Sequence, residues 1–165
     1  AWKRERLASA GIAIPPALTF APVDFEHESL AEGLGAAGFD PARRSFFTWL
    51  GVTPYLTEQA IFATLDAIAN LPGGAEVVFD YANPPEAIDD PERRAAHEEL
   101  AARVAAAGEA FRCYLDTPTL HARLTALGFS EIEDLGPTEI AARYFPGRAT
   151  PAARTGGHVL RAATR

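Results

Sequence analysis

The stretch SFFTWLGVTPYLTEQAIFATLDAIANLPGGAEVVFDY, residues 45–81, decides the fold. Its opening run, Ser45 to Leu50, is apolar and aromatic, which predicts a strand buried on both faces. Thr57 is the predicted N-cap of a helix whose apolar residues recur at helical spacing, and the sequence LPGG at 71–74 ends it. Glu76 to Tyr81 predicts a second buried strand. A strand, a helix and a strand of this length indicate a right-handed βαβ unit in a parallel sheet.

The residues that follow the first of these strands are expected to form a ligand site, because ligands of open α/β sheets bind at the carboxyl ends of the strands. Trp49 and Tyr55 each offer a flat apolar face and one polar group. Gly51 lets the backbone approach a ligand closely. Packing of the two aromatic rings in the core is the alternative interpretation, and the residues alone do not decide between the two.

Further elements are predicted on both sides of this unit. Toward the N-terminus, Trp2 to Ala10 predicts a helix and Leu18 to Val23 a short strand, and Ser29 begins a brief helix. Toward the C-terminus, Asp90 followed by Pro91 is a strong helix start. The remaining predicted elements are a helix from Thr117 to Leu127, a strand from Ile132 to Leu135, a short helix from Thr138 to Tyr144, and a last strand from His158 to Ala163.

Composition, with 48% hydrophobic and 22% charged residues, indicates that residues 1–165 form one α/β domain or part of a larger one. The net charge of −7 argues against a nucleic-acid partner bound through a broad basic surface. No apolar run approaches the roughly 18 residues that cross a membrane. Cys113 is the sole cysteine, which excludes an internal disulfide and fits a reducing, cytoplasmic compartment.

Motifs for several kinds of chemistry are missing from the sequence. The four histidines are scattered without the spacing of metal ligands, so we interpret them as polar or exposed side chains without a metal. The sequence contains neither a G-x-S-x-G nucleophile turn nor a phosphate-binding G-x-x-x-x-G-K loop. Cys113 is interpreted as a small core residue rather than a nucleophile.

Asp24 and Phe25 follow the predicted strand from Leu18 to Val23 and combine a hydrogen-bond acceptor with an apolar ring. A purine requires that pairing, since the carboxylate accepts from the exocyclic amino group and the ring covers the base. An aspartate at a strand end is also a common turn or capping residue, which is the structural alternative.

Six phrases in this order resemble one family across essentially the whole chain: LTFAPVDFE (18–26), FTWLGVTPYLT (47–57), VVFDY (77–81), GEAFRCYLD (108–116), LTALGF (124–129) and ARYF (142–145). The chain resembles the leucine carboxyl methyltransferase-like group of class I S-adenosylmethionine-dependent methyltransferases, which includes many bacterial O-methyltransferases. The resemblance implies a Rossmann-like sheet of strand order 3-2-1-4-5-7-6 with an antiparallel final strand, and S-adenosyl-L-methionine as the cofactor.

The resemblance also implies roles for single residues. Asp24 and Phe25 would flank the adenine, and the segment from Trp49 through Leu50 and Gly51 to Tyr55 would line the methionine and acceptor side. Leu50 stands where family members often carry an acidic residue, so that polar contact is missing here. As groups that orient a small-molecule acceptor, the candidates are Tyr55, Arg112 and Arg143.

Two hallmarks of the family, the glycine-rich loop after strand 1 and the acidic ribose-binding residue after strand 2, should precede Ala1. Because the sequence also contains no methionine, we expect further residues before it and an incomplete sheet that begins at strand 3. Strand 3, Leu18 to Val23, would lack its neighbours, so we expect it at an edge, paired directly with the next strand, or paired with another chain. The last strand, His158 to Ala163, should lie antiparallel between the strands at 76–81 and 132–135.

The sequence therefore predicts a methyltransferase that acts on the oxygen of a small-molecule hydroxyl or carboxylate. No dedicated nucleophile is expected, because positioning supplies most of the acceleration of methyl transfer. An amino methyltransferase is a second interpretation, based on Asn83-Pro84-Pro85, but Glu86 stands where that motif has an aromatic residue. A non-catalytic binding or structural domain is a third. Neither the acceptor nor the oligomeric state can be inferred from the sequence.

Overall fold

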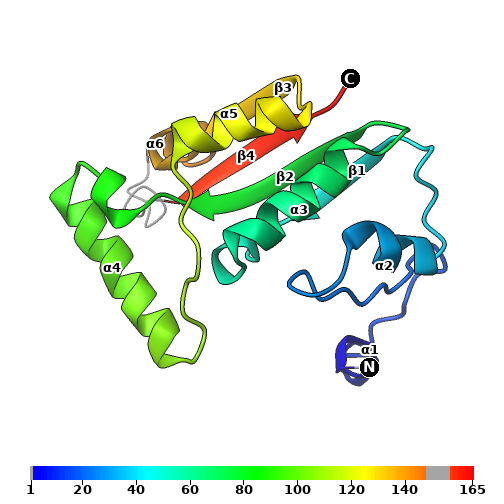
Figure 1. Cartoon of the computed structure of the whole chain (residues 1–165). Coiled ribbons are helices and arrows are strands. Elements are labelled where there is room, and N and C mark those ends of the chain that lie inside the picture. The colour runs from blue at the N-terminus through cyan, green and yellow to red at the C-terminus, as the bar shows by residue number, and fades with distance from the viewer. Residues whose placement is uncertain (1, 148–156) are drawn as a thin grey trace.

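A computed structural model describes residues 2–147 and 157–165. Four strands form one mixed sheet in the order β1-β2-β4-β3, with β1 at Ser45–Trp49, β2 at Ala75–Ala82, β3 at Glu131–Leu135 and β4 at Gly157–Ala163 (Figure 1). β1 and β2 are parallel, and β4 runs antiparallel to both of its neighbours. The α/β class, the parallel first pair and the antiparallel insertion of the last strand are confirmed. The longer seven-strand order remains a prediction.

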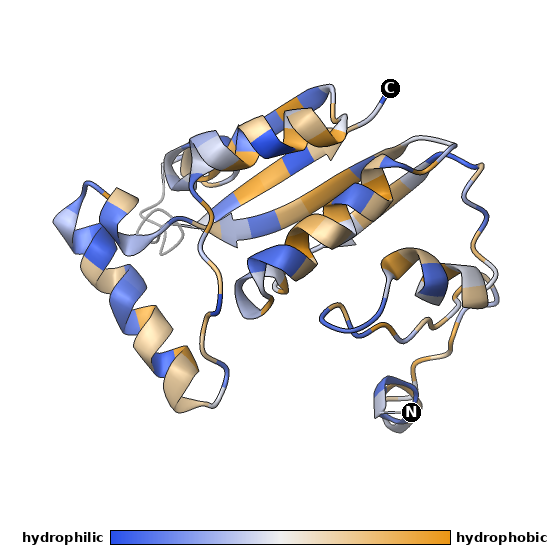
Figure 2. Cartoon of the chain, in the orientation of Figure 1, coloured by the Kyte–Doolittle hydropathy of each residue, from blue (hydrophilic) through white to orange (hydrophobic). Residues whose placement is uncertain are grey.

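Two helices, α3 (Glu58–Ala69) and α5 (Thr117–Leu127), cover one face of this sheet (Figure 1). Both helices bury apolar residues against it, and Figure 2 shows apolar residues recurring along α3. The largest fully buried side chains of the two helices and the sheet are Ile61, Leu65, Ile68, Leu120, Leu124, Val77, Phe79 and Leu160. Because burying one such side chain contributes about 1.5–3 kcal/mol, this layer is the main source of stability.

Local signals set the ends of the helices. The Thr57 side chain accepts a hydrogen bond from the Ala60 N–H and caps α3, as predicted. Asp90 caps α4 (Pro91–Ala106) in the same way through the Arg93 N–H. Gly128 ends α5 in the left-handed conformation with φ 103°, which favours glycine. Each cap satisfies backbone groups that the helix itself leaves unpaired.

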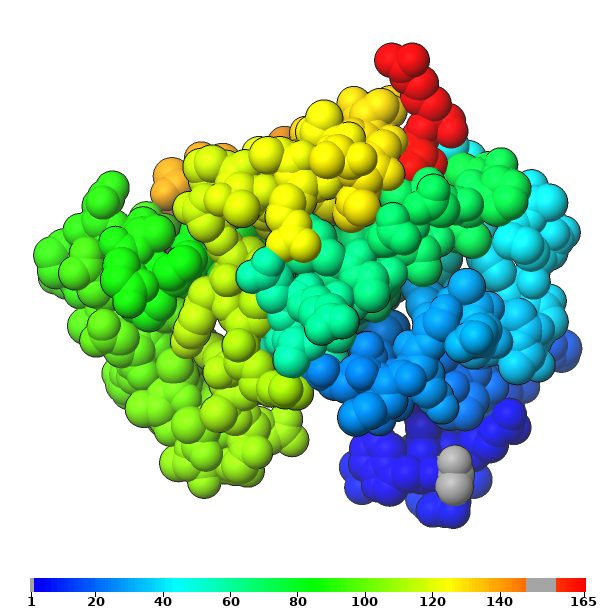
Figure 3. All heavy atoms as spheres, in the orientation of Figure 1, coloured from blue at the N-terminus to red at the C-terminus, as the bar shows by residue number. Residues whose placement is uncertain are grey.

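The other elements lie around this core. They are α1 (Trp2–Ser9), α2 (Leu30–Ala36), the short 3-10 helices η1 (Thr53–Tyr55) and η2 (Pro85–Ala87), and α6 (Pro137–Tyr144). α4 and its loops project from one end of the core and the N-terminal segment from the other, and Figure 3 shows the two as separate lobes with a notch between them. Among the described helices, none is long and apolar enough to cross a bilayer.

Two sequence-based expectations are wrong. Leu18 to Val23 forms no strand, because no strand of the described part lies beside it to complete a hydrogen-bond ladder. The first strand ends at Trp49 rather than Leu50 and is covered on one face only. Phe46, on its other face, is 61% exposed, because the described helices that cover β1 pack on the face of Phe47 and Trp49.

Candidate functional site

The turn after β1 is bonded to the end of β2. The N–H of Gly51 donates to Oδ1 of Asp80 at 2.7 Å, and the Thr53 hydroxyl donates to the Asp80 carbonyl oxygen. Gly51 has a φ of +71°, in the left-handed region that side chains other than glycine rarely adopt. These contacts hold the carboxyl ends of the two parallel strands side by side, which is the edge where the sequence predicts a ligand site.

The segment that carries Asp24 and Phe25 is anchored at the same edge. The Phe25 ring lies 5.4 Å from the Trp49 ring, centroid to centroid. Glu26 accepts hydrogen bonds from the backbone N–H of Thr57 at 2.7 Å and from its hydroxyl at 3.0 Å. Arg112 pairs with the same carboxylate at 3.1 Å. The structure thus brings together residues that are far apart in the sequence, as the predicted site requires.

Asp24 is held in a local turn and remains open to solvent. One carboxylate oxygen accepts from the Glu26 N–H at 3.0 Å, and the other lies 3.1 Å from Nδ1 of His27. The hydrogen bond from Glu26, and then the contact with His27, lower the pKa of Asp24. Its side chain is 60% exposed. An ionised carboxylate with room for a further donor fits the amino group of an adenine.

The adenine of S-adenosyl-L-methionine, the cofactor that the family resemblance implies, needs an apolar wall as well as an acceptor. The Phe25 ring supplies an apolar wall beside the carboxylate, and Trp49 next to it is buried with an indole N–H that has no hydrogen-bond partner in the described part of the chain. Leu50 is exposed, so it supplies surface but no polar contact. These residues fit the adenine end of the cofactor.

A cleft of about 360 Å³ opens at the end of β2 and is lined in part by Pro54 of η1. Its size is within the range of small-molecule sites. The residues that line it are Pro54, Asp80, Tyr81, Ala82, His97, Leu100, Phe111, Ile140, Gly157, His158 and Val159. Tyr55 lies at this end of the site, with its ring 5.6 Å from Phe111. The cleft is mostly apolar, and its polar lining residues are Asp80, Tyr81, His97 and His158.

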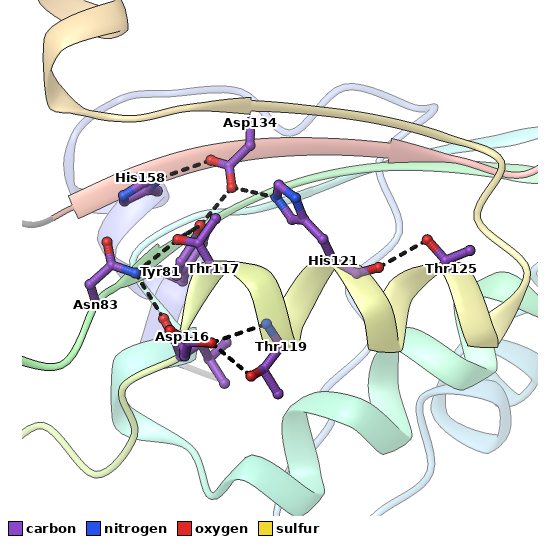
Figure 4. Close-up of polar contacts among 10 residues, drawn as sticks. Tyr81, Asn83, Asp116, Thr117, Thr119, His121, Thr125, Asp134 and His158 are labelled. Atoms are coloured by element: carbon purple, nitrogen blue, oxygen red, sulfur yellow. Dashed lines mark hydrogen bonds and ion pairs between the residues drawn. The ribbon is translucent and has the colours of Figure 1, made fainter. Parts of the chain in front are cut away.

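A buried carboxylate joins three elements beside this cleft (Figure 4). Asp134, with a side chain 8% exposed, accepts from the Tyr81 hydroxyl at 2.6 Å and lies 2.7 Å from Nε2 of His121, both on Oδ2. Its Oδ1 lies 2.9 Å from Nδ1 of His158. Burial raises the pKa of Asp134, but the hydrogen bonds from His158, Tyr81 and His121 outweigh burial and lower it. Asp134 is therefore ionised.

The direction of the hydrogen bonds around Asp134 follows from its carboxylate, which can only accept. The single proton of the Tyr81 hydroxyl is donated to Asp134, so Thr117, 2.8 Å away, donates its own proton to Tyr81. Thr117 Oγ1 accepts from the Asn83 amide at 2.9 Å. Burial, with the Asp134 contact, raises the pKa of Tyr81, which keeps this phenol protonated. His121 and His158 then donate to the remaining lone pairs of the Asp134 carboxylate.

This cluster was not predicted from the sequence. The interpretation of the histidines as polar or exposed is wrong for His97, which is only 2% exposed, whereas His121 and His158 are polar partners of Asp134. The partners of Asp134 come from β2, α5 and β4, and only the sheet register places them together. A partial signal was available, since Asp134 and His158 each stand in a predicted strand otherwise rich in apolar residues. Cys113 is buried, as predicted, and burial raises its pKa.

The two predicted arginines have different positions. Arg112 lies at the candidate site, where its backbone N–H donates to the Pro54 carbonyl oxygen at 2.7 Å and its side chain pairs with Glu26. Arg143 pairs with Glu133 on the edge strand β3 at 2.8 Å, on the opposite side of that strand from Asp134. The structure therefore does not bring Arg143 to the other predicted residues.

Comparison with known proteins gives a match to a family model and a similar protein. Residues 1–69 match the model of the leucine carboxyl methyltransferase family. The chain is 28% identical over 148 residues to the "Putative S-adenosyl-L-methionine-dependent methyltransferase YktD" of Bacillus subtilis (strain 168). That match covers 88% of this chain and 48% of the relative, so the chain spans about half of that protein's length.

Two solved structures are similar in part. One, a possible exported protein of Bordetella parapertussis, aligns with a TM-score of 0.49 at 16% identity, covering 99% of this chain and 58% of the other. The other is a DUF574 family protein of Streptomyces avermitilis, with a TM-score of 0.49 at 12% identity. That alignment covers 85% of this chain and 54% of the other.

By its name, that relative is one of the S-adenosyl-L-methionine-dependent methyltransferases. The family match over residues 1–69 and the similarity to this relative agree with the resemblance to the leucine carboxyl methyltransferase-like group that the sequence carries. S-adenosyl-L-methionine is the cofactor that this family implies.

Proposed function

We propose that the protein containing this chain is an S-adenosyl-L-methionine-dependent methyltransferase that acts on an oxygen atom of a small molecule. The observation that carries the proposal is the adjacency of two sites on one sheet edge. The residues that fit adenine lie at the end of β1, the cleft lies at the end of β2, and the Gly51–Asp80 hydrogen bond joins the two. A methyltransferase needs such neighbouring sites for donor and acceptor.

Each residue group has a separate role in this proposal. Asp24 accepts a hydrogen bond from the adenine and Phe25 covers its ring, while Glu26 holds both in place through Thr57. Tyr55 and Arg112 stand between this segment and the cleft, where they orient the acceptor. When bound, S-adenosyl-L-methionine supplies a methyl group on a positively charged sulfur.

The apolar walls of the cleft contribute by excluding water and fixing the acceptor. Phe111, Leu100 and Ile140 form these walls. Orientation of two reactants can supply roughly 7–11 kcal/mol of the barrier reduction, so the protein needs no nucleophile of its own. This agrees with a site built from packing groups, one carboxylate and a few hydrogen-bond partners.

Calorimetric titration of the intact protein with S-adenosyl-L-methionine and with S-adenosylhomocysteine tests the donor half of this proposal. Stoichiometric binding of both is expected. A panel of small hydroxyl and carboxylate acceptors, followed by release of S-adenosylhomocysteine, tests the transfer. Failure of the intact protein to bind either compound would contradict the proposal and favour a non-catalytic domain of this fold.

A further inference from the structure

We propose that Nε2 of His158 binds the hydroxyl group of the methyl acceptor and accepts its proton, and that the cleft takes small aromatic hydroxyl compounds. This inference rests on the methyltransferase function proposed above and names its acceptor class. It starts from the buried carboxylate Asp134, which neither the sequence nor the family resemblance assigned to the site.

The His158 ring is fixed on two sides. Its Nδ1 lies 2.9 Å from Oδ1 of Asp134, and its plane stacks on the Tyr81 ring at a centroid distance of 4.8 Å and an angle of 26°. Because Nδ1 faces Asp134, Nε2 is turned away from that carboxylate, as Figure 4 shows. The same residue lines the cleft, so the free edge of the ring borders the space for the acceptor.

The hydrogen-bond network also assigns the tautomer of this ring. Asp134 is an ionised acceptor, and the chain of donors through Thr117 and Tyr81 ends on its Oδ2. The other carboxylate oxygen, Oδ1, accepts a hydrogen bond from His158, so Nδ1 of His158 carries the proton. In a neutral imidazole with Nδ1 protonated, Nε2 holds a lone pair and accepts hydrogen bonds.

The lone pair on Nε2 of His158 serves a hydroxyl acceptor, which needs a base, but not a carboxylate acceptor. A carboxylate is already ionised at neutral pH and needs no base, whereas a hydroxyl must lose its proton. In the proposed step the acceptor O–H bond breaks, its electron pair stays on oxygen, and an N–H bond forms at Nε2 of His158. The positive charge of the resulting imidazolium is stabilised by Asp134, 2.9 Å from Nδ1.

The walls of the cleft favour an aromatic acceptor. Phe111, Leu100 and Ile140 present apolar surface, and a flat ring fits a volume of about 360 Å³. A phenolic hydroxyl has a pKa near 10 in water, as tyrosine does, which is within reach of an imidazole base during reaction.

Fluorine NMR of the intact protein, without methyl donor, tests the inference with a matched pair of probes. 4-Fluorophenol carries the hydroxyl, and 4-fluoroanisole replaces its proton by a methyl group. The protein should bind the phenol about tenfold more tightly, the effect of one hydrogen bond of about 1.4 kcal/mol. His158→Phe should abolish this preference, and His158→Gln should keep part of it because its amide oxygen still accepts.

Two further variants separate orientation of the ring from folding. His121→Gln keeps a donor to Asp134 and does not change the lining of the cleft, so the preference for the phenol should remain. Asp134→Asn should reduce the preference by changing the tautomer of His158. Nitrogen NMR reads this directly, since the proton should reside on Nδ1 in the original protein and redistribute to Nε2 in the variant.

Equal affinity for the two probes, or a preference that survives His158→Phe, would overturn the inference. Calorimetric titration with S-adenosyl-L-methionine on the same samples keeps the two proposals apart. Donor binding without a phenol preference would overturn the role of His158 alone. A phenol preference without donor binding would support that role and contradict the methyltransferase function.

Discussion

The rings of His158 and Tyr81 stack at positions that face each other across the antiparallel pair β2 and β4, with centroids 4.8 Å apart. This contact places His158 beside Asp134 on the next strand and beside the cleft at the end of β2. The last strand of the chain thus brings a histidine to the edge where the first two strands end. Stability and ligand binding should both respond to changes in these residues.

Asp134→Asn should destabilise the protein by about 1.5–3 kcal/mol, because hydrogen bonds to a buried charged group contribute on that scale. The change keeps the shape of the side chain and removes the charge that accepts from both histidines. Urea unfolding of the intact protein measures this change in the free energy of unfolding. Asp66→Asn on the exposed surface of α3 is the matched control and should lie within about 0.5 kcal/mol of the original protein.

The stability conferred by Asp134 should depend on pH in the acid range. Its pKa in the folded protein lies below the ordinary value of 3.8, because three hydrogen bonds outweigh burial. The unfolded chain therefore binds a proton more readily, so this stability is present above pH 3.8 and is lost as pH falls through the folded pKa. When the free energy of unfolding is measured at decreasing pH, Asp134→Asn should lose less of it than the original protein. An identical loss would contradict the lowered pKa of Asp134.

Gly51→Ala should destabilise the turn after β1. The φ of +71° costs a residue with a side chain about 1–2 kcal/mol, although an added Cβ would meet no other atom of the described structure within 4 Å. Thermal unfolding measures the cost. Gly35→Ala in α2 is the control, because it adds the same group in equally open space without a positive φ and should be neutral or stabilising.

Asp24→Ala should weaken the binding of S-adenosyl-L-methionine to the intact protein about tenfold, the effect of one lost hydrogen bond. Asp40→Ala provides a control, since Asp40 also accepts from a backbone N–H two residues ahead in an exposed turn but lies outside the predicted site. Calorimetry compares the two variants. Equal affinities for the cofactor would return Asp24 to the role of a turn residue.

His97→Phe should stabilise the protein by about 1 kcal/mol. His97 is buried against Phe111 and Tyr114, and its Nε2 has no hydrogen-bond partner among the described residues. A phenyl ring keeps the stacking and removes the unsatisfied nitrogen. Chemical unfolding measures the gain. The same change at the exposed His27 should bring no gain, and a loss at His97 would mean that its imidazole has a partner.

The sequence by itself determined the elements whose signals are local. Thr57 and Asp90 cap their helices because each side chain reaches a backbone N–H three residues ahead. The spacing of Ile61, Leu65 and Ile68 defines the buried stripe of α3, and the crossover helix between β1 and β2 predicts their parallel pairing. These features depend on a few neighbouring residues, so a pattern is enough to predict them.

Only the tertiary structure decided the features that depend on neighbours distant in the sequence. In the part of the chain that the structure describes, residues 18–23 have no pairing strand and Phe46 has no covering element, although both stand in segments with the composition of buried strands. Asp134 and His158 are 24 positions apart, and the register of β3 on β4 brings them to 2.9 Å. A slip of one residue would turn either side chain to the opposite face of the sheet, so no local pattern could have predicted that they meet.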